Sequence, residues 1–102
     1  MTGDTHNRKL VTIVTEAALE SALARDIENL GAHGYTITDA RGKGSRGVRN
    51  AGWDSSSNIR MEVVCGATTA DAICQHLEQN YYANYSMIVF VIDVDVLRKD
   101  KF

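Results

Sequence analysis

Apolar residues in the first third of the chain follow two different spacings. From Lys9 to Val14 they occupy both odd and even positions and are mostly β-branched, which predicts a strand buried on two faces. The next apolar residues recur at spacings of four and three, which predicts a helix with Thr15 as its N-cap and an end at Gly31. The apolar stripe of this helix consists of Leu19, Leu23, Ile27 and Leu30.

The rest of the chain predicts three more strands and a second helix. Tyr35–Ala40 is the second strand, and Asn58–Cys65, which alternates apolar and polar residues, is the third. The second helix begins near Thr68, with Asp71 as a capping partner. Its apolar stripe consists of Ile73, Leu77 and Tyr81. Met87–Val94 then supplies a last strand that is apolar on both faces.

This order of elements predicts an α+β fold of the ferredoxin-like βαββαβ type, a four-stranded antiparallel sheet with two helices on one face. Short right-handed crossovers place both helices on the same face, so the opposite face stays uncovered in a monomer. Because the first and last strands are apolar on both faces, we expect the uncovered face to pack against other copies of the chain. We assign residues 9–102 to a single domain and residues 1–8 to a flexible N-terminal segment.

Composition and charge exclude several classes of function. The 102 residues, 44% hydrophobic and 24% charged, are typical of one globular domain. A net charge of -2 gives no field that would attract nucleic acid, so no nucleic-acid partner is expected. No apolar run approaches the roughly 18 residues of a membrane span, which predicts a cytoplasmic protein. Cys65 and Cys74 lack metal-site spacing, so we expect two packed, reduced thiols and no metal.

The stretch from Gly42 to Arg49, GKGSRGVR, combines three glycines with three cations and a hydroxyl. Glycines let backbone amides approach an anion, and Arg46 and Arg49 supply forked donors for phosphate oxygens. Lys43 adds a point charge. This composition suits a phosphate group, although a solvated loop without a ligand explains it equally well.

Two known nucleotide motifs are similar to this stretch but do not fit it. Residues 42–47 satisfy G-x-G-x-x-G, yet that motif needs a helix that opens at the loop, and residues 48–57 have no helical period. The P-loop is also excluded, because no Gly-Lys-Ser/Thr closes the run. Trp53, in the same loop, either docks a partner or packs back on its own subunit.

The chain resembles the PII signalling proteins along almost its whole length. The resemblance is carried by residues 34–38 (GYTIT), by Gly42-x-Gly44 and by residues 59–64 (IRMEVV). Within that superfamily, residues 14–16 (VTE) together with the string GKGSRxVR are most similar to the carbon-linked PII-like branch. That branch contains regulators of bicarbonate transporters and carboxysome-associated relatives.

The resemblance implies a ferredoxin-like homotrimer with nucleotide sites in the clefts between subunits and a T-loop, about residues 42–58, that changes order with the ligand. It implies nucleotide-binding roles for Thr36, Gly42, Gly44, Ser45, Arg46, Arg49, Glu62 and Val64. Lys43 joins this set through its charge. Tyr85 either packs in the core or lines the base pocket, and Glu62 is either a ligand contact or a solvated strand carboxylate.

The implied ligand is an adenine nucleotide. The glycine- and lysine-rich B-loop of nitrogen-sensing PII proteins is replaced here by residues 81–86 (YYANYS), so AMP, ADP or cyclic AMP is expected rather than ATP. The branch adds bicarbonate as a candidate co-ligand. It also adds a bicarbonate transporter or a carboxysome-related protein as a candidate partner, at which the cytoplasmic protein would be located.

The main alternative is a small phosphate or nucleotide hydrolase on the same fold, because Arg46 and Asn50 could assist phosphate hydrolysis. No histidine of the sequence is placed to activate a nucleophile. His6, His33 and His76 fall on the N-terminal segment, on a turn and on the polar side of the second helix. We therefore expect a regulatory binding protein and not an enzyme.

Overall fold

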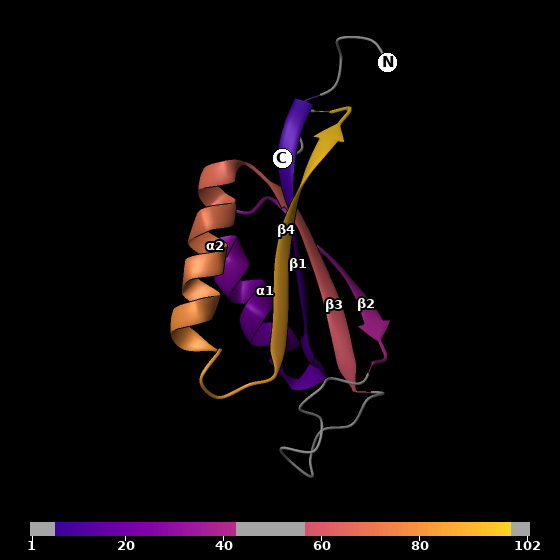
Figure 1. Cartoon of the computed structure of the whole chain (residues 1–102), viewed down its shortest axis with the longest axis vertical. Coiled ribbons are helices and arrows are strands. Elements are labelled where there is room, and N and C mark those ends of the chain that lie inside the picture. The colour runs from indigo at the N-terminus through magenta and orange to yellow at the C-terminus, as the bar shows by residue number, and fades with distance from the viewer. Residues whose placement is uncertain (1–5, 43–56, 99–102) are drawn as a thin grey trace.

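The computed structural model describes residues 6–42 and 57–98, which form one antiparallel sheet and two helices (Figure 1). The strands are β1 (His6–Glu16), β2 (Thr36–Ala40), β3 (Asn58–Cys65) and β4 (Met87–Val96), and the helices are α1 (Glu20–Asn29) and α2 (Ala67–Asn80), with a short 3-10 turn, η1 (Ala17–Leu19), before α1. The strand order is β2-β3-β1-β4. This is the predicted ferredoxin-like α+β fold.

Both helices lie against the same face of the sheet (Figure 1). Apolar side chains of β1 and β3 that point to this face alternate with those that point away, and the helices contribute their own apolar stripes. The resulting core is closed to solvent, and its fully buried members include Val11, Ile13, Leu23, Ile27, Met61, Val63, Ile73 and Leu77. The two predicted helical stripes therefore form the helix side of the core, with Leu30 and Tyr81 packed at its edge.

The opposite face of the sheet carries neither of the two described helices, as predicted (Figure 1). On β4 the side chains of Ile88, Phe90 and Ile92 are 59%, 41% and 49% exposed. The register places them beside Val14, Thr12 and Leu10 of β1. The open face therefore has an apolar band across β1 and β4, the two longest of the described strands. Such a band is typical of a surface that another protein subunit covers.

The structure corrects the predicted helix caps. Thr15 does not cap a helix, since its Oγ1 donates to the Ser86 carbonyl at 2.7 Å, and α1 follows the 3-10 turn with no side-chain cap. The second helix begins at Ala67, after Gly66, and Asp71 makes no capping bond there. The 3-10 turn before α1 and α2 itself start within two residues of the ends of β1 and β3, so packing on the sheet sets these starts more than local capping does.

The first strand is longer than its apolar pattern predicts. β1 begins at His6, which pairs with Val96 of β4, so residues 6–8 belong to the sheet and not to the N-terminal segment. His6, Asn7 and Arg8 pair with β4 alone, because the pairing of β1 with β3 begins at Lys9. This end of the strand has one neighbouring strand, and its residues are polar. Lys9 forms an ion pair with Asp93 on the same two strands.

Candidate functional site

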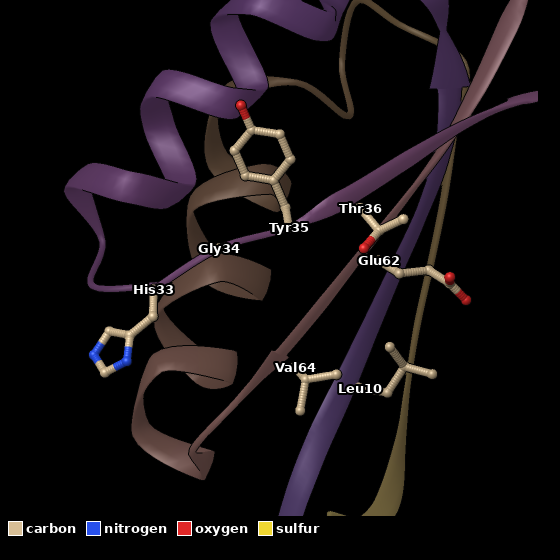
Figure 2. Close-up of a pocket in the computed structure, with 7 residues that line it drawn as sticks. All are labelled: Leu10, His33, Gly34, Tyr35, Thr36, Glu62 and Val64. Atoms are coloured by element: carbon tan, nitrogen blue, oxygen red, sulfur yellow. The ribbon is translucent and has the colours of Figure 1, made fainter. Parts of the chain in front are cut away.

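A hollow of about 620 Å³ lies on the sheet at the start of β2 (Figure 2). It is lined by Leu10, His33, Gly34, Tyr35, Thr36, Glu62 and Val64. In Figure 2 the side chains of Thr36, Glu62, Val64 and Leu10 lie along one side of the strands, whereas the ring of Tyr35 extends toward α1. Three of the site residues implied by the sequence, Thr36, Glu62 and Val64, therefore meet in one place.

Strand register brings these residues together. Thr36 of β2 pairs directly with Glu62 of β3, and Leu10 of β1 pairs directly with Val64 of β3. Directly paired residues of antiparallel strands point to the same face, with their Cβ atoms about 5 Å apart. The resemblance named Thr36, Glu62 and Val64 from separate parts of the chain, and the sheet makes them neighbours.

The lining gives the hollow an apolar floor and a polar edge. Leu10 and Val64 are half-buried aliphatic side chains, while Thr36 offers a hydroxyl and Glu62 a carboxylate. Glu62 has an ion-pair partner in Arg60 at 3.5 Å, on the exposed surface. An apolar floor with a few convergent polar groups is typical of small-molecule sites. The described residues that line the hollow include no Lys or Arg, so it suits an uncharged ring better than a phosphate.

Two further site residues lie at the other end of the sheet. Gly42 lies two residues beyond Ala40, where β2 ends, and an extended chain from Thr36 to Gly42 spans up to about 20 Å. Tyr85 belongs to the turn between α2 and β4, and its ring packs against that of Tyr81, with 5.8 Å between the ring centroids. Its side chain is 39% exposed, so it is not a core residue.

The structure therefore does not bring Gly42 and Tyr85 into the hollow of the same subunit. The remaining predicted residues, Lys43, Gly44, Ser45, Arg46 and Arg49, lie outside the described residues, as does Trp53.

A polar cluster at the end of α2 was missed by the sequence interpretation. The carboxylate of Asp26, on α1, accepts hydrogen bonds from the Tyr81 hydroxyl at 2.6 Å and from Nε2 of His76 at 2.9 Å. His76 therefore faces α1 and does not lie on a free polar side of its helix. Asn80 adds a contact to Nδ1 of His76 at 3.2 Å. Asp26 and His76 are fifty residues apart, and each falls on a position that its own helix pattern marks only as polar.

The hydrogen bonds of this cluster shift the acidity of its members. Burial works to raise the pKa of Asp26, but the hydrogen bonds from Tyr81 and His76 outweigh it, and the pKa lies below its ordinary value. Burial and the bond to Asp26 raise the pKa of Tyr81 to about 12. At neutral pH the carboxylate is charged and the phenol is neutral, so the cluster is a stable tie between α1 and the end of α2.

Neither metal ligation nor a disulfide is found in the described part of the chain. No group of three His, Cys, Asp or Glu side chains within residues 6–42 and 57–98 is arranged to hold a metal ion. Cys65 is buried, Cys74 is half-buried, and both are free thiols. Burial raises the pKa of each thiol above its ordinary value, so both are neutral packing groups at pH 7. No helix among these residues is long and apolar enough to span a membrane.

The fold and the hollow define a class before any particular family: small α+β proteins with one open sheet face and a hollow lined by residues of adjacent strands. The sequence profile described as nitrogen regulatory protein P-II matches residues 8–101. The chain therefore belongs to the P-II family, whose members are trimeric signalling regulators that bind small-molecule nucleotides.

Solved structures of PII-like proteins are similar to this chain over nearly its whole length. A PII-like signalling protein from Thermus thermophilus has 44% sequence identity and a TM-score of 0.83, over 97% of this chain and 98% of that one. CPII from Thiomonas intermedia, bound to ADP and bicarbonate, has 25% identity and a TM-score of 0.83, over 96% of each chain. The same CPII bound to ADP, AMP and bicarbonate gives 24% identity and a TM-score of 0.81, over 96% of this chain and 95% of that one.

Proposed function

We propose that this chain is a PII-like regulator of the carbon-linked branch, which binds AMP, ADP or cyclic AMP between the subunits of a trimer and signals through residues 42–58. The observation that carries the proposal is the hollow itself. Thr36, Glu62 and Val64, assigned to a nucleotide from sequence resemblance, line one hollow of about 620 Å³ on the sheet. The P-II family consists of signalling regulators, which supports a regulatory binding protein that is not an enzyme.

The hollow suits the adenosine part of the nucleotide. A planar base can lie on the aliphatic side chains of Leu10 and Val64, where it is removed from water. The Glu62 carboxylate can accept a hydrogen bond from an exocyclic amine or a ribose hydroxyl, and the Thr36 hydroxyl can donate or accept one. A phosphate in the hollow would be repelled by the Glu62 carboxylate, and the described lining has no Lys or Arg to offset the repulsion. The phosphate of the bound nucleotide therefore points away from the hollow.

The phosphate then lies near the cations of residues 42–49 of a neighbouring subunit. Within one subunit, Thr36 and Gly42 are at opposite ends of β2, so one copy of the chain does not place both halves of the site together. A trimer in which the open faces meet brings the hollow of one subunit toward the loop and Tyr85 of the next. In this arrangement Lys43, Arg46 and Arg49 supply charge-assisted hydrogen bonds to the phosphate.

Bicarbonate is the proposed co-ligand, and a partner in inorganic-carbon metabolism is the proposed receiver of the signal. The CPII structures that bind ADP together with bicarbonate support the pairing of the two ligands. The proposed partner is a bicarbonate transporter or a carboxysome-related protein, reached from the cytoplasm.

The test is calorimetric titration of the trimer with AMP, ADP, ATP and cyclic AMP, each with and without bicarbonate. We expect binding of AMP or ADP to be tighter than binding of ATP. Glu62→Gln replaces a carboxylate acceptor by a neutral one and Thr36→Val removes a hydroxyl, so each should weaken binding by about 5- to 10-fold, a loss of about 1 kcal/mol. Asp39→Asn, on the same strand as Thr36 but outside the hollow, is the matched control. Absence of binding by all four nucleotides would overturn the proposal.

A further inference from the structure

The junction between β1 and η1 contacts two distant parts of the chain. On one side, the Ala17 amide donates to the Ser57 carbonyl at 2.8 Å, at the point where the chain enters β3. On the other side, Thr15 and Glu16 contact Ser86, at the point where the chain enters β4. Three consecutive residues therefore hold the entries of both neighbouring strands.

Ser86 is held through both of its backbone polar groups. The Thr15 hydroxyl donates to the Ser86 carbonyl at 2.7 Å, and the Glu16 carboxylate accepts from the Ser86 amide at 3.1 Å. Thr15 is completely buried and Ser86 is half-buried, so the first bond is shielded from competing water. The second is charge-assisted, because the acceptor is a carboxylate.

Ser86 closes the turn that carries Tyr85. The start of this turn is fixed independently: the amides of Asn84 and Tyr85 donate to the Tyr81 carbonyl at 3.1 and 3.0 Å, and the Tyr81 hydroxyl bonds to Asp26. Tyr81 thus ties the turn to α1, whereas Thr15 and Glu16 tie it to β1. Tyr85 lies between these two anchors and contacts the ring of Tyr81.

We propose that Thr15 and Glu16 are positioning residues for the candidate nucleotide site. Their two hydrogen bonds to the Ser86 backbone, together called the grip, fix the turn at residues 81–86 relative to the sheet. They hold Tyr85 where a nucleotide contacts it. The inference rests on the proposed function for its ligand, but the grip itself is independent of any ligand. It also gives a role to two residues of the VTE string at 14–16, neither of which lines the hollow.

A matched pair of threonines on one strand makes the test sharp. Thr12 and Thr15 are both completely buried on β1, but the Thr12 Oγ1 has no hydrogen-bond partner among the described residues. Thr15→Val and Thr12→Val therefore replace the same hydroxyl by a methyl group at equally buried sites, and only the first removes a contact to Ser86. Glu16→Ala removes the second contact, and Glu16→Gln keeps an acceptor oxygen and should partly restore it.

The experiment measures two quantities on the trimer of each variant: hydrogen exchange of the amides of Tyr85 and Ser86 without ligand, and the dissociation constant for AMP or ADP by titration. In Thr15→Val and Glu16→Ala we expect exchange at these amides to rise about 5-fold or more and nucleotide affinity to fall about 5- to 10-fold. Thr12→Val should match the wild type in both, and Glu16→Gln, which keeps a neutral acceptor, should lie between Glu16→Ala and the wild type.

The two readouts separate the inference from the proposed function. Unchanged exchange at Tyr85 and Ser86 in Thr15→Val and Glu16→Ala would overturn the grip, whatever the affinity. Faster exchange with unchanged affinity would overturn the positioning role, because the turn would then not belong to the site. If the wild type binds none of the nucleotides, the proposed function and the ligand-positioning role fail together, while the exchange data still decide the grip.

Discussion

The two faces of the sheet carry similar apolar side chains but have different surroundings. On the face under the helices, Val11, Ile13 and Val63 are completely buried, whereas on the other face Ile88, Phe90 and Ile92 remain 41% to 59% exposed. The helix side also has a polar tie, from Asp26 to His76 and Tyr81. The helices of the same chain cover one face, whereas the other face needs further subunits to cover it, which is consistent with the trimers of the P-II family.

The largest effect is expected on the face that the chain completes by itself. Leu77→Ala removes a fully buried side chain of α2 and leaves a cavity, which should lower the free energy of unfolding by about 2 to 5 kcal/mol. Urea unfolding followed by circular dichroism, at one fixed protein concentration, measures it. A loss below about 1 kcal/mol would mean that the helix side repacks easily and that the contrast between the faces is smaller than exposure indicates.

A charge on the open face should break the assembly instead of the subunit. Phe90→Glu places a carboxylate in the apolar band of β4, so the trimer should dissociate, because a buried charge without a partner is costly at an interface. Light scattering at micromolar concentration gives the mass. Tyr82→Glu, at an exposed aromatic residue in the α2–β4 turn, should remain a trimer. A trimer formed by Phe90→Glu would place the interface elsewhere.

Next in size is the effect of the loop cations on the nucleotide. Arg46→Ala and Arg49→Ala should each weaken AMP or ADP by about 10- to 100-fold, since a charge-assisted hydrogen bond is worth about 1.5 to 3 kcal/mol. Lys43→Ala should cost less, and adenosine, which lacks phosphate, should be insensitive to all three changes. Titration with AMP, ADP and adenosine gives these values. Equal affinity of the wild type and the double arginine variant would show that these cations only solvate the loop.

The smallest effect concerns the polar tie on the helix side. The pKa of Asp26 is lowered in the folded state, so its contribution to stability is present above the unfolded value of 3.8 and is lost as pH falls through the folded value. Asp26→Asn should therefore cost about 1 kcal/mol at pH 7 and less at pH 3. Urea unfolding at pH 7, 5 and 3 tests the sign. An equal cost at all three pH values would mean that the carboxylate charge does not stabilise the fold.

Periodicity predicted most of the fold because each helix and strand has its own repeated apolar pattern. The helical stripes that include Leu23 and Leu77 form the core, and the two-sided pattern of the last strand correctly indicated an exposed apolar face. The capping roles of Thr15 and Asp71 were wrong: Thr15 donates its hydroxyl to a tertiary partner instead, and α2 begins after Gly66 with no side-chain cap. The start of β1 at His6 was missed because polar residues can extend a strand when a neighbouring strand supplies the hydrogen bonds.

The order of the elements and the identity of most core residues follow from the sequence alone, which also predicts, through resemblance, that Thr36, Glu62 and Val64 bind a nucleotide. Local repeats and short motifs carry this information, because each depends on residues only a few positions apart. The tertiary structure was needed to show that Thr36 and Glu62 pair across two strands and that Tyr85 lies apart from them in one subunit. It was also needed to show that Thr15 and Glu16 bond to the Ser86 backbone. These contacts join residues far apart in the chain, so strand register and helix packing, which no local pattern encodes, bring them together.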